Sequence, residues 1–100
     1  MTRQELLLVM LMEECDETSQ RASKALRFTL EEVHEGQIMT NAERIIYEFN
    51  DLCAVMEILN EEGIFNKPSF LDHEYIKLKR AKIEKWLKYS EEQGTLTHTN

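Results

Sequence analysis

Helix-breaking residues are scarce in this chain, and that scarcity limits how it can fold. The 100 residues contain three glycines and one proline, and alternation of β-branched with polar residues is almost absent. Long segments without breakers, in which apolar residues recur at helical spacing, are typical of α-helices. The sequence therefore predicts an all-α fold.

Two helices are expected before the proline. The first spans residues 2–28. The second opens at Thr40, and Glu43 follows three positions later, which is the spacing of a capping box. Gly63 suits the position just after a helix, so the second helix should end near it.

A third helix is expected after Pro68, because a proline restricts its predecessor to extended backbone. Its cap is Ser69 or Asp72, and it should continue to about Tyr89. The last residues, 94–100, form a polar tail. Three helices of this length fit one domain that spans the whole chain, residues 1–100.

The first two helices are predicted to form an antiparallel hairpin. Their connection, residues 29–39, is longer than the about 2–8 residues usual in helical bundles, so it is either a lid or a packed connector. Residues 6–12 are apolar on every side of the first helix, which indicates a further partner helix and hence a dimer. The apolar stripe expected on the second helix comprises Ile45, Ile46, Phe49, Leu52, Cys53, Met56 and Leu59.

The composition disfavours two classes of partner. The formal net charge is −7 and the isoelectric point is near 4.9, whereas nucleic acids and anionic membranes require a basic footprint. No segment reaches the about 18 apolar residues of a membrane span, and residues 6–12 do not continue as a signal peptide. We expect a soluble, cytoplasmic protein without a nucleic-acid or membrane partner.

Two pairs of acidic residues are candidates for a functional site. Glu14 and Glu17 in the first helix, and Glu48 and Asp51 in the second, are each spaced i, i+3, which puts both carboxylates of a pair on one helix face. Hard divalent cations take such oxygen ligands, and Mg²⁺ completes its shell with water and phosphate oxygens. The pairs therefore favour a metal site for a phosphate compound.

The two pairs are expected to meet across the hairpin. Glu17 lies about 11 residues before the end of one helix and Glu48 about 8 after the start of the other, an axial mismatch of roughly 5 Å. Two carboxylates about 5 Å apart repel by roughly 3 kcal/mol at an effective dielectric near 20, so convergence calls for a cation between them. The alternative is that both pairs belong to solvated acidic faces.

Basic residues follow the same helix faces. Arg21 and Lys24 continue the stripe of Glu17, and Arg44 lies one turn before Glu48. They either bind the outer phosphates of a polyphosphate or pair with the neighbouring carboxylates. A di-iron site would place histidines three positions after the glutamates, but no histidine lies there.

The sequence around the acidic pairs resembles that of a known protein family. Residues 13–17 (EECDE) and 48–51 (EFND) look like the ExxE…ExxD signature of the MazG-like all-α nucleoside triphosphate pyrophosphohydrolases. Residues 21–28 (RASKALRF) and 40–44 (TNAER) resemble its single-domain members from phages and bacteria. The likeness covers residues 4–63, with a looser match over 85–96.

The resemblance implies Mg²⁺-dependent cleavage of a nucleoside triphosphate to the monophosphate and pyrophosphate, with Mn²⁺ able to substitute. By this analogy the metal ligands are Glu14, Glu17, Glu48 and Asp51. Either Glu14 or Glu17 accepts the proton of the attacking water. The phosphate contacts expected beside them are Arg21, Lys24 and Arg27.

The family also forms homodimers and homotetramers around a four-helix core, in agreement with the apolar start of the first helix. The resemblance places the protein in the cytoplasm of a bacterial or phage-infected cell. It leaves open the base and sugar, the number of metal ions, and the choice between dimer and tetramer. The rival hypothesis is a non-catalytic helical oligomerisation module with exposed acidic faces.

Overall fold

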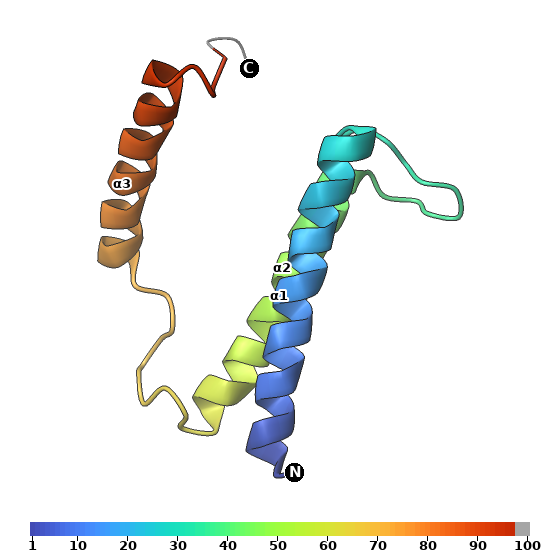
Figure 1. The fold of residues 1–100 in the computed structure, drawn as a ribbon. Coiled ribbons are helices and arrows are strands. Elements are labelled where there is room, and N and C mark those ends of the chain that lie inside the picture. The colour runs from blue at the N-terminus through green and yellow to red at the C-terminus, as the bar shows by residue number, and fades with distance from the viewer. Residues whose placement is uncertain (98–100) are drawn as a thin grey trace. The chain divides into compact units, whose positions relative to one another are not determined.

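The computed structural model describes residues 1–97, and all regular secondary structure in that range is helical. The helices are α1 (Arg3–Phe28), α2 (Asn41–Glu61) and α3 (His73–Glu92) (Figure 1). This confirms the all-α prediction. Within residues 1–97, no helix is both long and apolar enough to cross a membrane.

The chain divides into two compact units. The first, Met1–Phe70, contains α1, α2 and their connection, and the second begins at Leu71 and contains α3. That the whole chain forms one domain stays a prediction.

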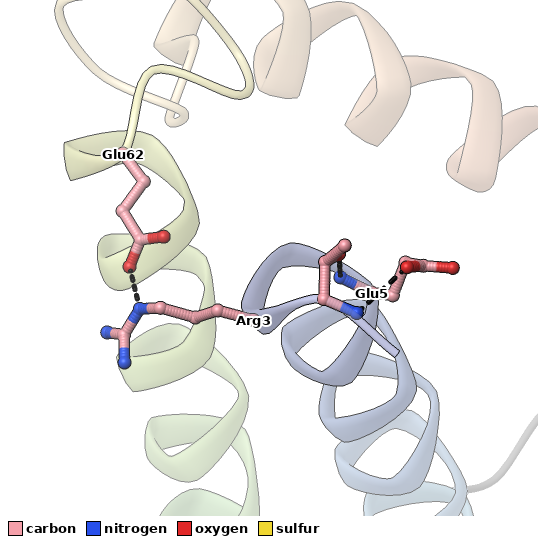
Figure 2. Close-up of polar contacts among 4 residues, drawn as sticks. Arg3, Glu5 and Glu62 are labelled. Atoms are coloured by element: carbon pink, nitrogen blue, oxygen red, sulfur yellow. Dashed lines mark hydrogen bonds and ion pairs between the residues drawn. The ribbon is translucent and has the colours of Figure 1, made fainter.

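Reciprocal side-chain bonds fix the start of both hairpin helices. At the start of α1, the Glu5 N–H donates to Thr2 Oγ1 at 3.1 Å and the Thr2 N–H donates to Glu5 Oε1 at 2.9 Å (Figure 2). The predicted capping box of α2 is present as well, with the Glu43 N–H 3.1 Å from Thr40 Oγ1 and the Thr40 N–H 3.0 Å from Glu43 Oε1. These bonds satisfy N–H groups that have no partner within the helix.

The end of α2 follows from Gly63. This glycine adopts φ +80°, a left-handed conformation that side chains disfavour. The turn lets the Gly63 N–H donate to Asn60 O and the Ile64 N–H donate to Leu59 O, each at 3.1 Å. This pair of bonds is a Schellman motif, and it confirms the predicted end of the helix.

The hairpin is antiparallel, with the start of α1 beside the end of α2 (Figure 1). Leu7 packs against Val55 and Leu59 in a small buried core. At the same end, Arg3 Nε donates to Glu62 Oε2 at 2.8 Å (Figure 2). The Arg3 side chain is 73% exposed, so this ion pair adds at most about 1 kcal/mol and the apolar contact holds the register.

The predicted apolar stripe of α2 is only partly buried. Leu59 is fully buried, but Ile46 is 58% and Phe49 50% exposed, and the buried residue Val55 was not in the predicted stripe. In α1, Leu7 is buried while its neighbours Leu6 and Leu8 remain exposed. One partner helix covers only one face of each helix, so the apolar surface left over is consistent with oligomerisation, which stays a prediction.

The connection between α1 and α2 is tied to the start of α2. Asn41 is only 2% exposed, and its Nδ2 donates to Thr29 O at 2.8 Å and to Glu32 Oε1 at 3.1 Å. Two backbone bonds add to this clamp, from the Asn41 N–H to Glu32 O at 2.9 Å and from the Ala42 N–H to Leu30 O at 3.0 Å. These bonds favour the packed connector over the lid.

The third helix is capped by Asp72, whose Oδ1 accepts from the Tyr75 N–H at 3.0 Å. It ends at Glu92, three residues beyond the predicted end at Tyr89. Gly94 is the reason, because its φ of +77° makes the turn that stops the helix. The predicted polar tail lies partly outside the described residues, which end at residue 97.

Replacing Asn41 by Ala should lower the free energy of unfolding by about 1–3 kcal/mol, because Thr29 O and the Glu32 carboxylate lose a buried donor. Chemical denaturation followed by circular dichroism measures the loss. Asn50→Ala is the matched control, since Asn50 is exposed and its side chain donates to Ile46 O within its own helix. Equal losses in the two variants would contradict the clamp.

Candidate metal centre

Three of the predicted site residues come together across the hairpin. Glu14 and Glu17 from α1 and Glu48 from α2 each offer a carboxylate oxygen, and these three atoms all lie within 4.8 Å of one another. The i, i+3 spacing puts the two α1 side chains on the face that contacts α2. We call Glu14, Glu17 and Glu48 the carboxylate cluster.

Asp51, the fourth predicted ligand, lies beside this cluster. It is exposed, and its oxygens are not among the three mutually close atoms. Its negative charge nevertheless contributes to raising the pKa of both Glu14 and Glu48. The arrangement therefore consists of three close carboxylates and a fourth within electrostatic range.

Glu14 lies in surroundings that are unfavourable for an ionised side chain. Its Oε2 is buried and has no hydrogen-bond partner among residues 1–97. Burial is the main reason that the pKa of Glu14 is raised, and the charges of Glu17, Asp51 and Glu13 add to the effect. Both causes disfavour the carboxylate form.

Glu48, on the opposite helix, has similar surroundings. Its Oε2 is also buried without a partner in the described part of the chain. Burial raises the pKa of Glu48 first, the adjacent Glu17 carboxyl raises it next, and the positive charge of Arg21 opposes the rise. Arg21 thus lies close enough to act on the cluster electrostatically.

These observations fit a hard divalent cation. A buried carboxylate oxygen without a partner is costly, and a cation between the three side chains would satisfy both such oxygens and relieve the repulsion. The donors are all carboxylate oxygens, which suit Mg²⁺, Mn²⁺ or Ca²⁺ rather than Zn²⁺ or Cu⁺. Clusters of exposed acids are common without a metal, so the two buried oxygens carry this inference.

A second feature lies beside the predicted phosphate contacts. A pocket of about 140 Å³ is formed by α1, the connection and the start of α2. We call it the cationic pocket. Its lining residues are Arg21, Lys24, Phe28, Glu32, His34, Gln37, Asn41 and Arg44.

The three residues that are predicted to contact phosphate do not all lie in the pocket. Arg21 and Lys24 line the cationic pocket, whereas Arg27 does not. The Arg27 guanidinium lies over the Phe28 ring, 4.9 Å from its centroid, in a cation–π contact. Binding of phosphate by these residues stays a prediction.

The pocket also contains residues that the sequence did not identify as functional. The spacing along α2 places Arg44 on the face of Glu48, but His34 and Gln37 belong to the connection, where helical spacing does not predict which side chains come together. The available signal was the length of the connection, since long ordered loops in compact domains are often functional.

Comparisons with protein families, with curated proteins and with solved structures found no match to this chain. The resemblance to the MazG-like pyrophosphohydrolases therefore stays a prediction based on the motifs. Any proposal about function has to be supported by the carboxylate cluster and the cationic pocket themselves.

The raised pKa values of Glu14 and Glu48 predict how stability depends on pH and metal. Between the usual pKa of a glutamate, about 4.3, and the raised value, the folded protein binds more protons than the unfolded chain. Without metal, stability should therefore fall as pH rises through this window. At a pH above this window, Mg²⁺ or Mn²⁺ at a concentration of ten times the Kd of that cation should raise the Tm of the protein by roughly 6–11 °C.

Differential scanning fluorimetry at pH 4 and pH 7.5 tests this expectation. Glu48→Gln should raise the metal-free Tm at pH 7.5 and abolish the increase caused by metal. Glu57→Gln, which removes an exposed acid from the same helix, should preserve that increase. A Tm that does not respond to either cation at pH 7.5 would exclude the metal centre.

Proposed function

We propose that the protein is a Mg²⁺-dependent hydrolase of the MazG-like type, which converts a ribo- or deoxynucleoside triphosphate to the monophosphate and pyrophosphate. The observation that carries the proposal is the pair of buried, unpartnered oxygens of Glu14 and Glu48 in a three-carboxylate cluster. The cationic pocket beside the cluster supports a polyphosphate as the ligand that accompanies the metal.

The carboxylates would hold the cation. Glu14, Glu17 and Glu48 supply the three close oxygens. Asp51, which is exposed and is not one of these three, is the fourth proposed ligand. Bound Mg²⁺, or Mn²⁺ in its place, supplies neutralisation of phosphate charge and a lower pKa for water at the site.

The remaining chemistry falls to side chains of the cluster and the pocket. Water attacks the α-phosphorus, the bond from that phosphorus to the oxygen bridging to the β-phosphorus breaks, and pyrophosphate leaves. Glu14 or Glu17 accepts the proton that the water loses. Arg21 and Lys24 contact the phosphates and stabilise their charge, and Arg27 is a further predicted contact.

A non-catalytic oligomerisation module is the alternative. Exposed apolar side chains on the hairpin, such as Leu6, Ile46 and Phe49, support assembly into a homodimer or homotetramer under either hypothesis. The net charge of −7 disfavours a nucleic-acid partner, and the proposed location in the cytoplasm rests on the family resemblance. Only the hydrolase hypothesis requires metal-dependent turnover.

Incubation with Mg²⁺ and a panel of ribo- and deoxynucleoside triphosphates should release pyrophosphate from at least one of them. Asp51→Asn and Glu17→Gln should each lower kcat/KM by at least about a hundredfold, because each removes a charged group from the reacting site. Glu57→Gln is the control and should retain wild-type activity. Absence of release from every nucleotide, or full activity of Asp51→Asn, would refute the hydrolase and favour the oligomerisation module.

The position of attack can be tested separately. In water enriched in ¹⁸O, one labelled oxygen should appear in the nucleoside monophosphate and none in the pyrophosphate, because the proposed attack is on the α-phosphorus. Mass spectrometry of both products measures the label. Label in the pyrophosphate would indicate attack on the β-phosphorus and would contradict the proposed reaction, even if the products were the same.

A further inference from the structure

We propose that Asn41 is a positioning residue, which holds the Glu32 carboxylate away from the basic side chains of the cationic pocket and thereby keeps their charge unpaired. That these basic groups serve a nucleoside triphosphate rests on the proposed function, whereas the restraint of Glu32 rests on the contacts of Asn41. Three observations support the proposal: the unpaired basic groups, the attachment of Glu32 to Asn41, and the chemistry of the amide.

The pocket brings charges of both signs together without pairing them. Among its lining residues, Glu32 is acidic and Arg21, Lys24 and Arg44 are basic. A carboxylate beside guanidinium and ammonium groups normally forms a charge-assisted hydrogen bond with one of them. Within residues 1–97, however, no ion pair joins Glu32 to any of the three. Something else must therefore determine where the Glu32 carboxylate lies.

Glu32 is attached to Asn41 at two points. Its Oε1 accepts from Asn41 Nδ2 at 3.1 Å, and its backbone O accepts from the Asn41 N–H at 2.9 Å. Asn41 is itself only 2% exposed, and the same Nδ2 donates to Thr29 O at 2.8 Å. A buried network of this kind restrains its members. The Glu32 side chain is thus held by a residue that cannot easily move.

The amide of Asn41 suits this task because it is neutral. An amide nitrogen carries two hydrogens, and Asn41 Nδ2 donates to Thr29 O and to Glu32 Oε1. It therefore provides the Glu32 carboxylate with a donor and adds no charge to the pocket. An aspartate at this position would repel Glu32, and an alanine would release it.

The basic side chains show the consequence. Arg21 Nε is buried and has no acceptor among residues 1–97, although the Glu32 carboxylate lines the same pocket. Arg44 follows Asn41 by three positions in α2, which puts the two side chains on one helix face. Arg44 is therefore the basic residue that a released Glu32 carboxylate should bind.

A double-mutant cycle between Glu32 and Arg44 tests the restraint without any ligand. The unfolding equilibrium constants of the wild type, Glu32→Gln, Arg44→Gln and the double variant give the coupling between the two side chains. In the wild-type background this coupling should be less than about twofold, because the groups do not pair. In the Asn41→Ala background it should rise to about fivefold, as for a favourable ion pair near the surface. Sucrose in every sample keeps the destabilised variants folded.

Enzyme kinetics provide a second readout. With the nucleotide that the wild type hydrolyses, Asn41→Ala should raise KM about fivefold and leave kcat within about twofold, because the released Glu32 carboxylate competes with the substrate. Addition of Glu32→Gln should return KM to within about twofold of the wild-type value. Glu31→Gln removes an exposed carboxylate that does not line the pocket, so it should not restore KM. A merely structural role of Asn41 predicts no rescue by either substitution.

The outcomes separate this proposal from the proposed function. If no nucleotide is hydrolysed, the proposed function fails and the double-mutant cycle alone decides the role of Asn41. Fivefold coupling in the wild type, or equal coupling in both backgrounds, would overturn the restraint of Glu32. Equal effects of Glu32→Gln and Glu31→Gln on the KM of Asn41→Ala would also overturn it, and hydrolysis by the wild type would then leave the proposed function standing.

Discussion

The register between α1 and α2 is the constraint on which the rest of this structure depends. Leu7 against Val55 and Leu59 sets it at one end of the hairpin, and the Asn41 clamp on the connection holds the other. Each residue along a helix turns the side chain by about 100°, so a slip of a single position would separate the carboxylates of the two helices. Residues outside the carboxylate cluster thus decide whether its three carboxylates meet.

The features that the sequence predicts well are governed by near neighbours along the chain. The capping box at Thr40 and the turn at Gly63 need only local bonds, and both helix ends lie where expected. Burial is different, because it depends on what a partner surface covers. The pattern therefore does not predict that Val55 is buried, and it places Phe49 in the apolar stripe although Phe49 is half exposed.

The candidate site shows the same difference between features that the sequence predicts and features that it does not. Spacing and depth were enough to predict that the pairs on α1 and α2 would approach, and Glu14, Glu17 and Glu48 do. They could not predict where a long side chain points: Arg27 lies over Phe28 instead of in the pocket. Spacing and depth also could not predict the contribution of the connection, because the Asn41 clamp joins Asn41 to Thr29, 12 positions away in the sequence.

Unsatisfied charges of both signs lie along one face of this hairpin. Within residues 1–97 the buried side-chain atoms without a partner are Glu14 Oε2, Glu48 Oε2, Arg21 Nε and Asn60 Oδ1. The neutral amide of Asn60 costs less to bury than a charge does. The other three are two carboxylate oxygens and one guanidinium N–H, so neither a cation alone nor an anion alone would satisfy them. The divalent cation and the polyphosphate of the proposed function would together satisfy all three. Local departures from good packing of this kind are expected at functional sites.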